Sequence, residues 1–171
     1  MNTRNMILAL VTAAGLVTAC APTKQAEKRG GETPTTTQPA KGAKIGQSVK
    51  DGKFTFVVTK VSTRTSSIGP EGVGKKPQGK FVLVNMKVTN HGKEAQTFDG
   101  DSQKLLAGDK EYSADTEAAI YLESARSLLE EINPGNTVNG TVIFDVPTEV
   151  TPSAIELHDS PFSAGVRVNL R

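Results

Sequence analysis

Apolar residues fall at every second position along several stretches of this chain, and this spacing restricts its fold more than any other feature. In residues 137–146 (TVNGTVIFDV), Val138, Val142, Phe144 and Val146 share one side, while polar residues occupy most of the other. Such alternation is typical of a β-strand that buries one face. Three more segments alternate or are rich in β-branched and aromatic residues: 53–61 (KFTFVVTKV), 81–88 (FVLVNMKV) and 165–171 (GVRVNLR). Together they predict a mostly β fold.

Shorter candidate strands and turn sequences divide the remainder into pieces of similar length. The weaker strand candidates are residues 45–49, 95–98, 104–107, 111–114 and 154–158. Asp51-Gly52, Asn90-His91-Gly92 and Asn133-Pro134-Gly135 are typical turn sequences between them. Many short strands with frequent turns predict an all-β, Ig-like, two-sheet antiparallel β-sandwich of about seven to nine strands.

Residues 115–132 depart from the two-residue alternation. Ala118, Leu122, Ala125 and Leu129 recur there at steps of three and four, which is helical spacing. We therefore expect one short connecting helix at residues 116–124, whereas residues 127–132 fit an edge strand equally well.

The dipeptide Asn139-Gly140 is a second local conflict. Asn-Gly usually marks a hairpin turn, yet here it interrupts an alternating run of apolar residues. We interpret it as part of a continuous strand, in which the glycine marks a bulge.

The chain opens with a positive charge and then an apolar run. After Arg4, residues 6–17 are apolar or small throughout, apart from Thr12. A helix of this length rises about 18 Å, short of the about 30 Å of a membrane core, so the run is typical of a signal peptide. Val17-Thr18-Ala19-Cys20, with the only cysteine of the chain, resembles the lipobox of bacterial lipoproteins. That resemblance implies cleavage before Cys20 and a palmitate-type lipid anchor in the cell membrane, on its extracytoplasmic side.

Composition divides the chain into a signal peptide (residues 1–19), a lipidated cysteine with a flexible tether (20–44) and one domain (45–171). Residues 21–44 hold no large apolar side chain, so they cannot bury enough surface to offset the entropy of ordering. Residues 45–171 carry 14 Lys and Arg against 16 Asp and Glu, with no tryptophan and no basic stripe. We therefore do not expect nucleic-acid binding.

Several runs occur in an order that resembles a known family. They are GKFVLVNMKVTNHGKEAQTF (79–98), GDKEYSAD (108–115), INPGNTVNGTVIFDVP (132–147) and IELHDSPFSAGVRVNL (155–170). Together they are similar to the telokin-like, immunoprotective-extracellular family of bacterial Ig-like domains, a family of unknown function found in secreted proteins and lipoproteins. The resemblance implies an Ig-like sandwich in an extracytoplasmic setting. It implies no catalytic residues.

The residue types that carry out catalysis or bind metals are sparse. His91 lies in a turn sequence, and His158 should point outward from its strand, without another histidine or a cysteine at ligand spacing. His158 and Asp159 should face opposite sides of a strand, so they do not fit a catalytic triad. Asp99, Asp101 and Asp109 fit solvated turns better than a calcium loop. We expect no metal, no cofactor and no enzymatic activity.

Residues 62–79 form the most suggestive loop. The segment is rich in glycine and serine, is longer than a sandwich connection requires, and carries Arg64, Lys75 and Lys76. Loops of this kind on rigid sandwiches often bind ligands, although a disordered loop fits the composition as well. The leading hypothesis is a membrane-anchored, non-catalytic module that binds an envelope protein. The alternative is a carrier or sensor of a small envelope ligand, such as a lipid held between the sheets.

Overall fold

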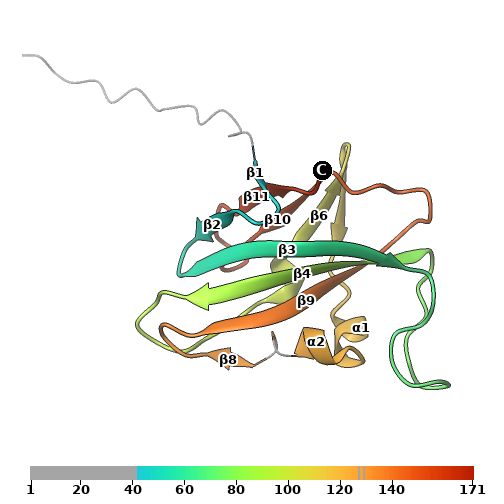
Figure 1. Cartoon of the computed structure of the whole chain (residues 1–171), viewed down its shortest axis with the longest axis horizontal. Helices are drawn as coiled ribbons and strands as arrows, with labels where there is room; N and C mark the ends of the chain where they lie inside the picture. The colour runs from blue at the N-terminus through green and yellow to red at the C-terminus, as the bar shows by residue number, and fades with distance from the viewer. Residues whose placement is uncertain (1–41, 127, 129) are drawn as a thin grey trace, which may run out of the picture. The chain divides into compact units, whose positions relative to one another are not determined.

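The computed structural model describes residues 42–126, 128 and 130–171. The predicted signal peptide, Cys20 and most of the predicted tether lie outside these residues. The described part is mostly β, and its strands form two principal sheets and a short ribbon (Figure 1). None of its helices has the length and apolar character needed to cross a membrane.

The two principal sheets pack face to face as a β-sandwich. The first, called sheet B, has the order β2 (Ser48–Asp51), β3 (Phe54–Arg64), β4 (Lys80–Asn90) and β9 (Thr137–Val146). The second, called sheet A, has the order β1 (Ala43–Lys44), β11 (Val166–Asn169), β10 (Ala154–Leu157), β6 (Lys104–Ala107) and β7 (Lys110–Ser113). The ribbon pairs β5 (Gln96–Thr97) with β8 (Glu131–Ile132). Eight of these strands have four or more residues, within the predicted seven to nine.

Aromatic and β-branched side chains fill the space between the sheets. The rings of Phe54, Phe56 and Phe98 form a cluster with centroid separations of 5.9, 6.2 and 6.4 Å. Phe144 of β9 and Ile155 of β10 belong to the same core, one from each sheet. Each fully buried side chain of this size stabilises the fold by about 1.5–3 kcal/mol. The inward-facing residues are those that the sequence alternation predicts.

Sheet A begins earlier in the chain than expected. β1 contains Ala43 and Lys44, the last two residues of the predicted tether, and pairs in parallel with β11. The strand predicted at residues 45–49 is partly wrong, because a turn precedes β2 at Ser48. In this turn Gln47 donates its N–H to the Lys44 carbonyl at 3.0 Å, and Gly46 has a φ of 86°. Glycine adopts such a conformation without steric cost.

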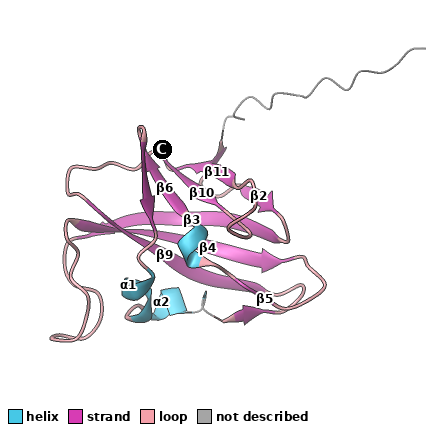
Figure 2. Cartoon of the chain, turned by 180° about the vertical axis from the view of Figure 1, so that it is seen from behind, coloured by secondary structure: helices cyan, strands magenta, loops and turns pink. Residues whose placement is uncertain are grey.

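The single predicted helix at residues 116–124 is two short helices, α1 (Thr116–Ile120) and α2 (Glu123–Arg126). Figure 2 shows both beside β9. The backbone N–H groups of Tyr121 and Leu122 donate to carbonyls three residues earlier, each at 3.2 Å. This tighter winding ends α1, because the carbonyls that would continue an α-helix are already used. The alternative strand predicted at residues 127–132 is confirmed only for its last two residues, which form β8.

Gly140 lies inside a continuous strand, as predicted, but not at a bulge. β9 keeps an unbroken register with β4 through this residue. The bulge in sheet B lies instead in β3, between Val58 and Lys60. A Cβ atom on Gly140 would approach Leu128 Cγ to 2.1 Å. The glycine is therefore needed because the buried Leu128 side chain crosses the strand at this point.

Candidate functional site

The loop at residues 65–79 follows β3 and is attached to the sandwich at two points. Ile68, near its start, is fully buried. Ile68 and Lys75 exchange two backbone hydrogen bonds of 2.9 Å and so close the loop on itself. The tip between them, residues 69–74, projects from the arrowhead end of β3 (Figure 1). The loop therefore projects from the domain and is held to it by the buried Ile68 side chain.

Lys75 attaches the loop to the start of α1. Its ammonium lies 2.9 Å from Asp115 Oδ1 and 2.6 Å from Glu117 Oε2. Hydrogen bonds to Glu117 and then to Asp115 raise the pKa of Lys75 above its usual value. Asp115 also caps α1, because its Oδ1 accepts the Ala118 N–H at 2.9 Å. One carboxylate therefore orients both the helix and the loop.

The loop and the two helices cover part of the outer face of sheet B. Ile68 packs there in a second, smaller core with residues of both helices and of two strands. The buried members of this core are Ile68, Phe81, Ala118, Ala119, Ala125 and Ile143. We call residues 65–79 together with α1 and α2 the loop–helix cap. Alternating residues of β4 and β9 that a simple sandwich would expose are buried beneath it, so both faces of these strands are apolar.

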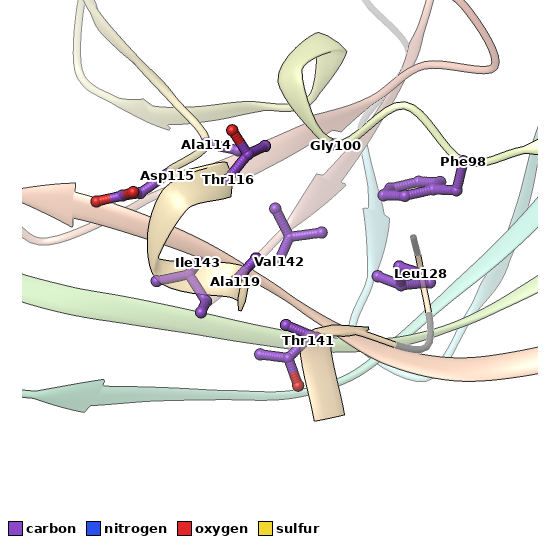
Figure 3. Close-up of a pocket in the computed structure, with 11 residues that line it drawn as sticks. Phe98, Gly100, Ala114, Asp115, Thr116, Ala119, Leu128, Thr141, Val142 and Ile143 are labelled. Atoms are coloured by element: carbon purple, nitrogen blue, oxygen red, sulfur yellow. The ribbon is translucent and has the colours of Figure 1, made fainter. Parts of the chain in front are cut away.

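A small apolar pocket lies where the cap meets the edge of β9. Figure 3 shows Ala119 over Val142 and Ile143, with Phe98 and Leu128 also lining the pocket. The space that a water molecule could occupy is only about 20 Å³. This is room for about one water and far too little for an acyl chain.

An open hollow lies at the base of the loop. It is lined by Gln78 and Gly79, by Asp145 and by the residues that follow β9, and holds about 400 Å³. The Asp145 carboxylate accepts the backbone N–H groups of Gln78 at 2.7 Å and Gly79 at 3.2 Å. Asp145 therefore fixes the return of the loop into β4 and is not free to bind a ligand strongly.

The three cations predicted as a binding set do not converge. Arg64 is the last residue of β3, and its Nε donates to the Ser66 hydroxyl at 2.9 Å. Lys75 is occupied by its two carboxylates. Lys76 is exposed and makes no ion pair with any described residue. The three side chains therefore make different contacts and do not form a common binding site.

Sequence reasoning missed the apolar part of the cap surface. Val73 at the loop tip is 66% exposed, and Ile120 at the end of α1 is 59% exposed. Val73 carried a weak signal, as an apolar residue between glycines at a predicted loop tip. Ile120 carried none, because a helix of five residues has no regular apolar face that could reveal an outlier.

The remaining polar candidates have structural partners. His158, predicted as the last residue of a strand, instead directly follows β10, and its Nε2 lies 3.0 Å from Glu156 Oε1. Asp159 instead receives the Lys53 N–H at 3.1 Å. Asp99 caps a 3₁₀ helix (Gly100–Ser102) and accepts the Asp101 N–H at 3.1 Å. Within the described residues, no group of three or more metal-ligating side chains is assembled.

The fold and the cap define the class: a β-sandwich, antiparallel except for the β1–β11 pair, with one outer face partly covered by a loop and two short helices. The family described as a domain of unknown function, DUF4352, matches residues 43–168. The chain belongs to this family. No curated protein matches it significantly.

Solved structures with the same fold come from several bacteria. The yjhA protein from Bacillus subtilis is 15% identical, with a TM-score of 0.53 over 75% of this chain and 99% of that one. The secreted protein MPT63 from Mycobacterium tuberculosis is 13% identical, with a TM-score of 0.53 over 75% and 95%. A conserved hypothetical protein from Bacillus anthracis is 20% identical, with a TM-score of 0.51 over 73% and 94%. At these identities the likeness concerns the fold alone.

Proposed function

We propose that this protein is a non-catalytic interaction module, held at the outer face of a bacterial cell membrane by lipid on Cys20. Support for the anchor comes from the sequence: a charged start, a short apolar run and the Val17-Thr18-Ala19-Cys20 lipobox. The secretion of MPT63, a protein of the same fold, agrees with an extracytoplasmic setting. The sandwich and the quoted runs also support placing the domain among telokin-like, immunoprotective-extracellular proteins.

The observation that carries the interaction role is the construction of the loop–helix cap. Its tip presents Val73, 66% exposed, on a loop that Ile68 and Lys75 attach to the body. Ordering a loop before binding reduces the entropy lost on binding. An attached loop with an exposed apolar tip is therefore suited to docking on an envelope protein.

The polar groups near the cap support a non-catalytic role. Lys75, Asp115 and Asp145 are engaged in holding the loop and the helix in place. A catalytic nucleophile or base needs a partner that activates it and an open position for substrate. These three side chains instead use their hydrogen-bonding capacity within the fold.

Site-specific photo-crosslinking in living cells tests this role. A photoreactive residue replaces Val73 in the full-length chain, and the matched control replaces Asp109, an exposed residue in the β6–β7 turn of sheet A. We expect one reproducible protein adduct from position 73 and none of that mass from position 109. Equal labelling from both positions, or none from position 73, would contradict the proposal that the cap is the docking surface.

The alternative, a carrier of a small envelope ligand, has less support. The apolar pocket beside β9 would have to enlarge many-fold to hold a lipid chain, since its present space is about 20 Å³. A native mass above the polypeptide mass after gentle purification would reinstate this alternative.

A further inference from the structure

Phe162 is the most exposed large apolar side chain of the described residues, with 97% of its surface accessible. It lies at the tip of the loop at residues 158–165, between β10 and β11. An exposed phenylalanine is a liability in water, because burying such a ring stabilises a protein or a complex. The cap described above lies elsewhere, so it does not account for this residue.

The turn that carries Phe162 is internally satisfied. Ser163 donates its backbone N–H to the Ser160 carbonyl at 3.1 Å and its hydroxyl to the same oxygen at 3.0 Å. Pro161 follows Ser160 and restricts the backbone at the first central position. The turn satisfies its own polar groups, and the Phe162 ring, 97% exposed, packs against no other described residue.

The base of this loop is joined to the start of β3. The Asp159 N–H donates to Asp51 Oδ2 at 2.7 Å, and Asp159 Oδ1 accepts the Lys53 N–H at 3.1 Å. Gly165, with a φ of 74°, lies directly against the His158 ring, where a Cβ atom would approach Cε1 to 2.4 Å. The loop is therefore a supported protrusion at the opposite end of β3 from the cap.

The chain enters the domain at the same end. The Gly42 carbonyl accepts Asn169 Nδ2 at 2.9 Å, and β1 then pairs in parallel with β11, the strand that directly follows the Phe162 loop. Cys20 lies 22 residues before Gly42. At about 3.4 Å per extended residue, a lipid on Cys20 would keep Gly42 within about 75 Å of the bilayer.

Exposed charges of both signs lie at this end of the domain. Lys53 leaves 47% of its side chain accessible, whereas its partner Asp159 leaves only 9%. Lys50 and Lys93 are exposed as well, and so are two acids, Glu94 and Glu131, which lie near each other because the Asn90 side chain donates to the Glu94 and Ile132 carbonyls. The chain before the domain adds four cations and two acids between Cys20 and Gly42. An exposed phenylalanine together with a net positive tether is the composition that favours an anionic lipid surface.

We propose that Phe162 inserts into the anionic lipid surface to which Cys20 anchors the protein, and so orients the domain with its cap away from the membrane. This inference rests on the proposed anchor. A lipid surface fits better than a protein partner, because a single protruding ring needs no matching surface, whereas a stable protein interface buries about 800 Å² per partner.

Tryptophan fluorescence tests the proposal directly, because the chain contains no tryptophan. Phe162→Trp is placed in the full-length lipidated protein on vesicles of equal parts phosphatidylglycerol and phosphatidylcholine. The matched control is Val73→Trp at the cap. We expect Phe162→Trp emission to shift to the blue and to be quenched by brominated acyl chains, and Val73→Trp emission to do neither.

The possible outcomes separate this inference from the anchor. Protein that floats with vesicles while Phe162→Trp stays unquenched would overturn the insertion and leave the anchor intact. Protein that does not float at all would overturn the anchor and the insertion together. A blue shift that depends on protein concentration and not on vesicles would assign Phe162 to contact with a second copy, contrary to the proposal.

Discussion

At the scale of single residues, Gly140 shows how a position without a side chain makes room for a core residue from another segment of the chain. It lies in β9, where the Leu128 side chain occupies the place of a Cβ atom, with its Cγ only 2.1 Å away from that position. The Leu128 side chain belongs to the main core and is 3% exposed. Its freedom to move aside is therefore limited.

Replacing Gly140 with alanine should destabilise the domain by about 1–3 kcal/mol, the usual effect of overpacking a buried site. Urea unfolding of the purified domain measures this difference. The double variant Gly140→Ala with Leu128→Ala should lose less than the sum of the two single changes, because the second change removes the clash. Strict additivity would show that the two residues do not compete for the same space.

The sequence could predict that Gly140 lies in a strand, but not why. Alternation of Val138, Val142 and Phe144 extends across the Asn-Gly pair, and that pattern is local. The contact with Leu128 joins residues twelve positions apart and depends on how the chain turns after α2. Without knowledge of that contact, a bulge is the local explanation for a glycine at this position. The structure shows that this prediction is wrong.

At the scale of elements, length and composition predict a loop at residues 62–79, but its first three residues belong to β3 and its attachments leave no signal in the sequence. Lys75 meets Asp115 and Glu117 some forty residues later. No local pattern reveals such pairs, because they arise when α1 packs against the outer face of sheet B. The binding set of Arg64, Lys75 and Lys76 was therefore grouped by sequence proximity alone.

Replacing Lys75 with methionine should lower the free energy of unfolding by about 0.5–1 kcal/mol at neutral pH, as expected for a partly exposed ion pair. Lys76→Met is the matched control and should have no such effect. Since folding raises the pKa of Lys75, its contribution is complete below the unfolded value of about 10.4 and is lost as the pH rises through the folded value.

Denaturant unfolding of wild type and both variants across alkaline pH provides the measurement. The gap between wild type and Lys75→Met should close at high pH, since neutral lysine no longer attracts the two carboxylates. An equal loss in Lys76→Met, or a gap that persists after deprotonation, would contradict the role of the ion pairs.

At the scale of the whole molecule, alternation was enough to predict a β-sandwich. The long strands β3, β4 and β9 each display it, and they form the centre of sheet B and one of its edges. The order of the strands could not be predicted from the sequence, because it depends on pairings such as β1 with β11, which join residues more than 120 positions apart. The second core under the cap is signalled only in part, because Phe81 and Leu83 make the outer face of β4 apolar at its start, while the segments that cover this face are distant in sequence.

Every proposal about this protein as a whole requires the chain to be attached to a membrane through Cys20. The most direct measurement is mass spectrometry of the mature N-terminal peptide, combined with membrane fractionation of wild type and Cys20→Ala. The account predicts a chain that begins at Cys20 and carries a diacylglycerol, together with release of Cys20→Ala from the membrane fraction. An unmodified Cys20 in the mature chain, or a Cys20→Ala protein that stays with membranes, would contradict it.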